Sequence, residues 1–281
     1  MLEALTTTEI EATTLDELMS LPAGLLDYKH TLSYTGSLPL EDLVTILRRH
    51  HTPVGELKDT PEFRFRSARK IESTQIYIVD QQTAQAQVRI EYPDGEYTED
   101  DTVLSSIYTN YFGSGMSSVV FQELREARAL AYSASARYAQ GGRLNDQNLM
   151  LGVIGTQTDK TVDALSAFID LIDNMPVSIE RFDESVNSLL NRYRTSKVNF
   201  RQVIGAVRGW KRLGIEGDPR RQRFQQLQDA AMDDLVNFQR EHVKGRPKLI
   251  SIVGDLSILD TQELEQFGTV QQLQVDDLFV E

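Results

Sequence analysis

Apolar and polar residues alternate along three short stretches that begin soon after residue 60. Residues 63–66, 75–79 and 84–92 place every second side chain on the same face, which is typical of strands with one buried face. The Pro93-Asp94-Gly95 triplet is a strong turn signal and is expected to end the third strand. One buried face and one wet face favour an antiparallel sheet over a parallel sheet that is covered on both sides.

Helical spacing replaces this alternation from residue 99 onward. Apolar side chains recur every three or four positions up to Tyr111, and the acidic residues 99–101 favour a helix start. The turn at residues 113–115 ends this helix, and Ser117 or Ser118 is placed to cap the next one. The remaining elements are strands at residues 131–138, 149–154 and 248–253 and a helical stretch from residue 158 to about 242. The whole pattern predicts an α+β fold, with a mostly antiparallel sheet, helices packed on one face and a helical block.

Two parts of the chain are similar at a separation of about 218 residues. Leu15-Asp16-Glu17-Leu18 is similar to Met232-Asp233-Asp234-Leu235, 217 positions later, and residues 32–36 are similar to residues 250–254. A repeat of this length indicates tandem domains. We therefore predict that residues 1–58 are the helix–strand–helix tail of a preceding homologous domain plus a linker, and that residues 59–281 form a complete second domain. The alternative is that any two helix–strand–helix ends look this similar.

Charge and cysteine content exclude several classes of protein. The chain has 42 Asp and Glu against 29 Lys and Arg, a net charge of −13, whereas nucleic-acid binding needs a clustered basic surface. Cysteine is absent, which excludes disulfides, thiolate metal sites and a thiol nucleophile. There is neither an apolar run of about 18 residues nor a basic-then-apolar secretion signal at the start. We expect no nucleic acid and no membrane span, and the compartment stays open between cytoplasm and periplasm.

No catalytic constellation is evident within the chain. The four histidines, His30, His50, His51 and His242, have no acidic or histidine partner at helical ligand spacing, and neither His-Glu-x-x-His nor His-x-x-Glu-His occurs. A metal held by His50 and His51 near Glu56 is a weaker interpretation than a solvated linker. The hydrolase motif Gly-x-Ser-x-Gly and a phosphate-binding loop are also absent. We predict that this chain alone has no catalytic residue, no metal ligand and no cofactor.

The most informative residues lie between Tyr111 and Ser133. A Gly-rich turn at residues 113–115 is followed by Ser117-Ser118, by a helix that carries Leu124-Arg125-Glu126, and by Leu130-Ala131-Tyr132-Ser133 at the start of a strand. This stretch resembles the C-terminal-type repeat of the insulinase/pitrilysin (inverzincin) zinc metallopeptidases. The resemblance extends over residues 63–281, and the tandem domains of that family agree with the repeat. Ser114 within the Gly run and Ala129, where Gly is usual, depart from the family pattern.

The resemblance implies that the two halves of a peptidase have different roles. In this family an N-terminal half carries His-x-x-Glu-His and holds zinc, while a C-terminal half faces it across a closed chamber and contacts the peptide through an Arg and a Tyr. Arg125 and Tyr132 match these two positions, and both side chains donate hydrogen bonds that suit peptide carbonyls. The implied function is a non-catalytic, substrate-binding C-terminal portion of a zinc metalloendopeptidase. Its partners would be a peptide and a zinc-containing N-terminal catalytic half, on the same polypeptide or in a separate subunit.

Two other functions stay open at this stage. The chain is alternatively a proteolytically inactive structural or assembly subunit with the same fold, or a peptide-binding module outside the family. The presence of both Arg125 and Tyr132 favours substrate contact. Each has an ordinary alternative: Arg125 forms an ion pair with Glu123 or Glu126 on a solvated helix face, and Tyr132 packs in the sheet on the same face as Ala134. A His-x-x-Glu-His motif in the parent or neighbouring reading frame would separate these functions.

Overall fold

The computed structural model describes residues 5–51, 55–62 and 70–278. The contacts between residues divide the chain into two compact units. In its described part, the first unit comprises residues 5–51, 55–62 and 198–208, and the second comprises residues 70–197 and 209–278. The strand predicted at residues 63–66 lies outside the described residues.

The first unit contains short helices, two of which begin with capping boxes. These are α1 (Thr7–Ala12), α2 (Leu15–Leu25), α3 (Leu40–His50) and the first part of α7 (Phe200–Arg212). Thr6 and Thr14 open α1 and α2 with reciprocal capping boxes, in which the Thr hydroxyl accepts from the Glu amide three residues on and the Glu carboxylate accepts from the Thr amide.

The helix–strand–helix prediction for residues 1–58 implies a strand at residues 32–36, and it is wrong there, because these residues form no strand. The described β-pairing in this unit is a single bridge between Tyr28 and Lys58. A strand requires a partner strand for its backbone groups, and an isolated extended segment has none. Thr35 Oγ1 instead donates to the Phe200 carbonyl at 2.8 Å, and the Arg208 guanidinium donates to Ser33 Oγ at 3.0 Å.

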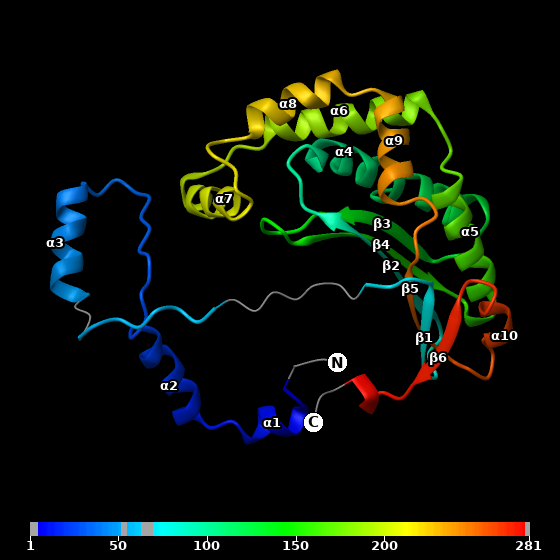
Figure 1. The fold of residues 1–281 in the computed structure, drawn as a ribbon, viewed down its shortest axis with the longest axis horizontal. Coiled ribbons are helices and arrows are strands. Elements are labelled where there is room, and N and C mark those ends of the chain that lie inside the picture. Colours follow the sequence, from blue (N-terminus) through cyan, green and yellow to red (C-terminus); the bar gives the residue numbers. More distant parts are fainter. Residues whose placement is uncertain (1–4, 52–54, 63–69, 279–281) are drawn as a thin grey trace. The chain divides into compact units, whose positions relative to one another are not determined.

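The second unit is built on one six-stranded sheet (Figure 1). The sheet order is β3-β4-β2-β5-β1-β6, with antiparallel pairing from β3 to β5 and parallel pairing of β1 with β5 and β6. The mostly antiparallel α+β prediction is therefore confirmed. The strands are β1 (Gln75–Asp80), β2 (Ala86–Glu96), β3 (Ser133–Ala139), β4 (Gln147–Thr156), β5 (Leu249–Gly254) and β6 (Thr269–Leu273).

Helices cover one face of this sheet (Figure 1). The helices α4, α5 and α9 lie next to the sheet, and α6 and α8 lie further out and pack on each other. The α-helices are α4 (Asp101–Tyr108), α5 (Thr161–Asp173), α6 (Ile179–Thr195), α8 (Arg220–Asp229), α9 (Met232–His242) and the short α10 (Thr261–Leu264). The other helical turns are the π-helical η1 (Thr109–Gly113) and η2 (Phe121–Ala127) and the 3-10 turns η3 (Thr158–Lys160) and η4 (Asp276–Leu278).

The core lies between the sheet and these helices. The alternating buried residues of the strands, such as Ile76, Val88 and Ile90, pack against aromatic residues of the helices, such as Phe112 and Phe168. Full burial of each side chain of this size contributes about 1.5–3 kcal/mol. No helix in the described part of the chain is both long and apolar enough to cross a membrane.

Two features of the sheet differ from the sequence-based expectations. β2 does not end at Pro93 but continues to Glu96, and β6 is an additional strand. Pairing of β2 with β5 stops at Glu91, whereas pairing with β4 continues through Pro93, so the missing N–H of Pro93 falls where β2 has lost a neighbour. This extension carries Asp94 onto the buried, helix-covered face of the sheet.

Candidate functional site

The segment that leads to Arg125 begins with a close approach of helix and strand. Gly113, the last residue of η1, lies against the backbone of Ala136 on β3, and any Cβ at this position would clash with the Ala136 carbonyl. Gly115 then turns the chain with φ +89°. Ser118 is buried, donates to the Gly115 carbonyl at 2.8 Å and accepts from the Phe121 amide, so the expected cap of this helix is Ser118.

The link from η2 to β3 is held by backbone hydrogen bonds. The Leu130 amide donates to the Leu124 carbonyl at 2.9 Å, and Ala129 between them has φ +49°. Thr156 Oγ1 on β4 donates to the Leu130 carbonyl at 2.5 Å, and the Tyr132 amide donates to the Gly155 carbonyl at 2.8 Å. These contacts attach the link to the end of β4 and set Tyr132 directly before β3.

Arg125 lies on the exposed side of the last turn of η2. Its guanidinium carbon is 4.8 Å from the centre of the Phe121 ring, and its Nε atom is 3.6 Å from Glu126 Oε1. The side chains of Arg125 and Glu126 are 49% and 53% exposed, so water screens this ion pair and it stabilises the fold little. Glu123, the other candidate partner, is 3.9 Å from Arg128 instead. The guanidinium therefore keeps donors available to a ligand.

Tyr132 is exposed although its neighbours on the same face of β3 are buried. Ala134, Ala136 and Tyr138 are buried, whereas Tyr132 is 53% exposed. Its hydroxyl oxygen accepts from Gln157 Nε2 at 3.0 Å, which leaves the hydroxyl hydrogen free to donate. Ordinary packing within the sheet does not account for this side chain. No hydrogen bond, ion pair or ring contact joins Arg125 to Tyr132 in the described residues, so a shared substrate contact stays a prediction.

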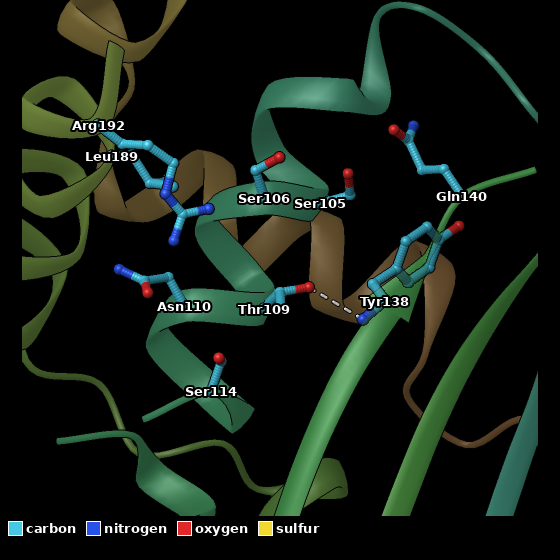
Figure 2. Close-up of a pocket in the computed structure, with 9 residues that line it drawn as sticks. All are labelled: Ser105, Ser106, Thr109, Asn110, Ser114, Tyr138, Gln140, Leu189 and Arg192. Carbon is cyan, nitrogen blue, oxygen red and sulfur yellow. Dashed lines mark hydrogen bonds between the residues drawn. The ribbon is translucent and has the colours of Figure 1, made fainter. Parts of the chain in front are cut away.

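Sequence reasoning missed a polar pocket of about 240 Å³ beside α4 and η1 (Figure 2). Ser105 and Ser106 come from α4, Thr109 and Asn110 from η1, and Arg192 from α6, and Ser114 directly follows η1. The residues 105–114 are serine- and threonine-rich, but the contribution of Arg192, about 80 positions later, cannot be inferred from spacing.

A buried acidic group also has partners that the sequence does not reveal. Asp94 accepts hydrogen bonds from Tyr138 Oη and from His242 Nδ1 at 2.7 Å, and it forms an ion pair with the Arg246 guanidinium at 2.8 Å. Burial alone would raise the pKa of Asp94, but the hydrogen bonds, chiefly from His242 and Tyr138, outweigh it and lower that pKa. The bond to Asp94 raises the pKa of His242, and Asp101, 3.7 Å from Nε2, adds to this effect.

The described residues contain no group of three His, Cys, Asp or Glu that is placed to hold a metal ion. His51 Nε2 lies 2.5 Å from His30 Nε2 in the first unit, and His30 Nδ1 contacts the Tyr28 carbonyl. These exposed rings offer two nitrogen atoms and no described third ligand, fewer than the three or four protein ligands of a typical zinc site.

Sequence comparison identifies a family. The family model described as the peptidase M16 inactive domain matches residues 30–189. The match covers more than half of the chain and runs across the boundary predicted at residues 58–59. No curated protein matches the chain by sequence.

Solved structures share this fold. A peptidase M16 inactive domain from Pseudomonas fluorescens has a TM-score of 0.67 at 13% identity, with 90% of this chain and 61% of that chain covered. A conserved protein from Enterococcus faecalis has a TM-score of 0.70 at 14% identity, with 91% and 59% covered. A protease from Helicobacter pylori has a TM-score of 0.63 at 16% identity, with 89% and 61% covered. The chain thus spans about 60% of the length of these structures, and at such identities the likeness shows the fold alone.

Proposed function

Because the chain belongs to the family of peptidase M16 inactive domains, we propose that it is the non-catalytic, substrate-binding C-terminal portion of a zinc metalloendopeptidase. In this proposal peptides are degraded inside a chamber between two halves, and zinc belongs to the partner half. The donor set of the described residues does not suit a zinc site, so no chemical step is assigned to a metal in this chain.

The observation that supports the proposal is the presence of two exposed hydrogen-bond donors on either side of the short link before β3. Arg125 lies in the last turn of η2, Tyr132 directly precedes β3, and the hydrogen-bonded link at residues 128–131 connects η2 to β3. Both side chains are exposed although each has buried neighbours, Leu124 and Ala134. A guanidinium and a free phenol hydrogen donate to peptide carbonyls and to an oxyanion that forms from one. Attack of water on a peptide carbonyl generates such an oxyanion, and the partner half would promote this attack.

Part of the sheet edge is covered by η1, which favours peptide binding through side chains over addition of the peptide as a further strand. β3 is the edge strand of the sheet, and an exposed edge can accept an extended peptide. However, Gly113 lies against the backbone of Ala136, and the Tyr138 amide donates to Thr109 Oγ1 at 3.0 Å. η1 therefore closes the edge along the second half of β3. Peptide contact is expected at its first end, where Tyr132 lies.

The first unit supports a preceding homologous domain as the partner. The bounds of α2 (Leu15–Leu25) and α9 (Met232–His242) correspond at an offset of 217 residues. Leu235 of α9 is fully buried against the second unit's core, whereas Leu18, its counterpart on α2, is 52% exposed. An amphipathic helix is stable when its apolar face is covered. We infer that residues 1–58 complete a preceding copy of this domain, which belongs to the catalytic half.

The substitutions Arg125→Ala and Tyr132→Phe test the proposed function in the complete protein that includes the catalytic half. Each is expected to lower kcat/KM for peptide hydrolysis by about 1–3 kcal/mol of transition-state stabilisation, the range for the loss of a charged or preorganised hydrogen bond. Arg128→Ala is the matched control, because Arg128 is exposed three residues further along and pairs weakly with Glu123. This control is expected to retain the wild-type kcat/KM.

Unchanged kinetics in both variants would mean that Arg125 is an ordinary surface residue and that Tyr132 serves only in packing. A complete protein that hydrolyses no peptide would instead favour the structural-subunit alternative. The chain alone is expected to show no peptidase activity and no stoichiometric zinc by elemental analysis. A bound zinc on which activity depends would overturn the division between the two halves.

A further inference from the structure

The polar pocket beside α4 has no part in the proposed function. It lies within the second unit, between α4 and η1 on one side and α6 on the other, and neither Arg125 nor Tyr132 lines it (Figure 2). Its volume of about 240 Å³ is below the ~300–1,000 Å³ of typical ligand pockets. A pocket of this size suits a small molecule rather than a drug-sized one.

The charge of the lining favours an anion. Arg192 contributes a guanidinium and none of the lining residues is acidic, although the chain carries 42 Asp and Glu. In the described part of the chain, Arg192 has no ion pair, and its guanidinium makes no hydrogen bond. Figure 2 shows its guanidinium directed toward Ser106, Thr109 and Asn110. An unpaired guanidinium beside neutral polar groups presents a fork of donors that matches carboxylate or phosphate oxygens.

The hydrogen bonds already made in the pocket define which donors remain. Thr109 Oγ1 accepts from the Tyr138 amide at 3.0 Å, so its own hydrogen is free to donate. Asn110 Nδ2 donates to the Ser185 carbonyl at 3.2 Å and keeps a second hydrogen. The Ser114 hydroxyl has no partner among the described residues. Three neutral donors therefore remain beside Arg192 for a single ligand.

Two other hydroxyls offer acceptors instead. Ser105 Oγ and Ser106 Oγ donate to the same Thr102 carbonyl, at 3.0 and 2.9 Å, so their remaining capacity is to accept. A ligand that satisfies the whole pocket carries an oxyanion and, next to it, a hydroxyl or a protonated acid group that donates.

The backbone around the pocket is fixed before a ligand arrives. η1 is π-helical, a form that is rare and concentrated at functional sites, and it is pressed against β3 at Gly113. The contacts of Thr109 and Asn110 with Tyr138 and Ser185 hold both side chains in place. Binding therefore orders mainly Arg192, which limits the entropic cost of binding.

We propose that this pocket binds the oxyanion group of a small hydroxylated acid, a carboxylate or a phosphate. Arg192 provides the charge and the donor fork, Thr109, Asn110 and Ser114 donate to the remaining oxygens, and Ser105 and Ser106 accept from the ligand's hydroxyl. The carboxylate and the phosphate are two sources of the same chemistry, and separate titrations distinguish them.

The test measures the thermal unfolding of the full chain in increasing concentrations of lactate, propionate or inorganic phosphate at constant ionic strength. A saturable rise in Tm of about 2–4 °C with an apparent Kd on the order of 1–10 mM is expected for lactate, phosphate or both. Lactate is expected to bind more tightly than propionate, which is the same acid without the hydroxyl. A rise that does not saturate, or no rise with any of the three, would overturn the proposal.

Arg192→Gln is expected to weaken the binding at least about tenfold, because it removes the charge and the fork of donors. Arg194→Gln is the matched control on the same helix, since Arg194 already donates to Asn191 and lies over the Phe224 ring. This control is expected to keep the wild-type Kd. For each variant, the rise in Tm is measured from its own ligand-free Tm. Ser114→Ala is expected to weaken binding severalfold without a change in the ligand-free Tm. Equal losses in Arg192→Gln and Arg194→Gln would show only general charge attraction and would overturn the site.

Discussion

Ala129 adopts a left-handed backbone conformation in the link that joins Arg125 to Tyr132. Its φ of +49° lies in the region that residues with a Cβ avoid, at a cost of about 1–2 kcal/mol. The family resemblance places Gly at this position, and the geometry gives the reason. Only a left-handed residue lets the Leu130 amide reach back to the Leu124 carbonyl. Ala129 therefore makes the left-handed turn that this hydrogen bond requires, and its Cβ adds strain to the link.

We expect Ala129→Gly to raise the free energy of unfolding by about 0.5–1 kcal/mol, because relief of the left-handed strain exceeds the added flexibility of the unfolded chain. Ala127→Gly, two residues earlier and also exposed, is the matched control. Ala127 has a helical backbone, so Gly there is expected to lower the free energy of unfolding by about 0.5–1 kcal/mol. Urea unfolding of both variants measures the two signs. Destabilisation by both would mean that Ala129 is not strained in solution.

At the scale of elements, α9 is attached to the sheet through a buried network at its C-terminal end. His242, the last residue of α9, contacts Asp94 of β2, and Phe238 one turn earlier stacks on the His242 ring at 4.5 Å. Asp101 and Tyr138 contribute from α4 and β3, and Arg246 from the loop after α9. The network therefore links four elements of the second unit, and its charges depend on pH.

The stability of the second unit is expected to decrease from about pH 6.5 upward. Because the folded pKa of His242 is raised, its contribution is complete below the unfolded value of about 6.5 and is lost as the pH rises through the folded pKa. The lowered pKa of Asp94 acts in the opposite direction, so its contribution is lost in acid as the pH falls through the folded pKa. Urea unfolding between pH 5 and pH 9 measures the slope. His242→Gln is expected to remove the decrease in stability above pH 6.5, whereas the control His50→Gln in the first unit is expected to keep it. An unchanged dependence of stability on pH in His242→Gln would contradict the assignment of this decrease to His242.

The sequence predicts the elements whose side chains alternate strongly between buried and exposed. β1, β2, β4 and β5 lie within a few residues of their predicted positions, because each buries one face completely. β6 escaped prediction because it has no fully buried residue and depends on parallel pairing with β1. The π-helical form of η1 and η2 also escaped, because their apolar spacing is the same as that of an α-helix. In each case, pairing or packing with distant residues decides the structure.

The candidate sites also differ in whether the sequence alone can predict them. Arg125 and Tyr132 are seven residues apart in a recognisable motif, so the sequence alone indicates them. The pocket depends on Arg192, and the buried network depends on the approach of His242 to Asp94, 148 positions away. No local pattern contains this information, since the fold of the sheet and of α6 and α9 creates these neighbours.

At the scale of the whole molecule, two helices with a similar pattern of residues differ in their surroundings. Leu15, Leu18, Leu21 and Leu26, in and just after α2, correspond at an offset of 217 to Met232, Leu235, Phe238 and Val243, in and just after α9. The four residues in and after α9 are buried, and the four in and after α2 are exposed. Segments of similar pattern are expected to need the same kind of cover. The exposure of these residues of α2 therefore favours the proposal that α2 belongs to a domain that precedes this one.

Replacement of Leu18 and Leu235, the two leucines at equivalent positions, by alanine tests this proposal. In the full chain studied alone, Leu235→Ala is expected to lower the free energy of unfolding by about 2–5 kcal/mol, the cost of a cavity in a packed core. Leu18→Ala is expected to change it by less than about 0.5 kcal/mol, because Leu18 is already in contact with water. In the complete protein that includes the preceding domain, Leu18→Ala is expected to cost about 2–5 kcal/mol as well, because its side chain then fills the equivalent core position. Urea unfolding of both lengths of protein measures the difference. A Leu18→Ala variant as stable as wild type in the complete protein would mean that α2 completes no preceding domain, whatever Leu235→Ala does.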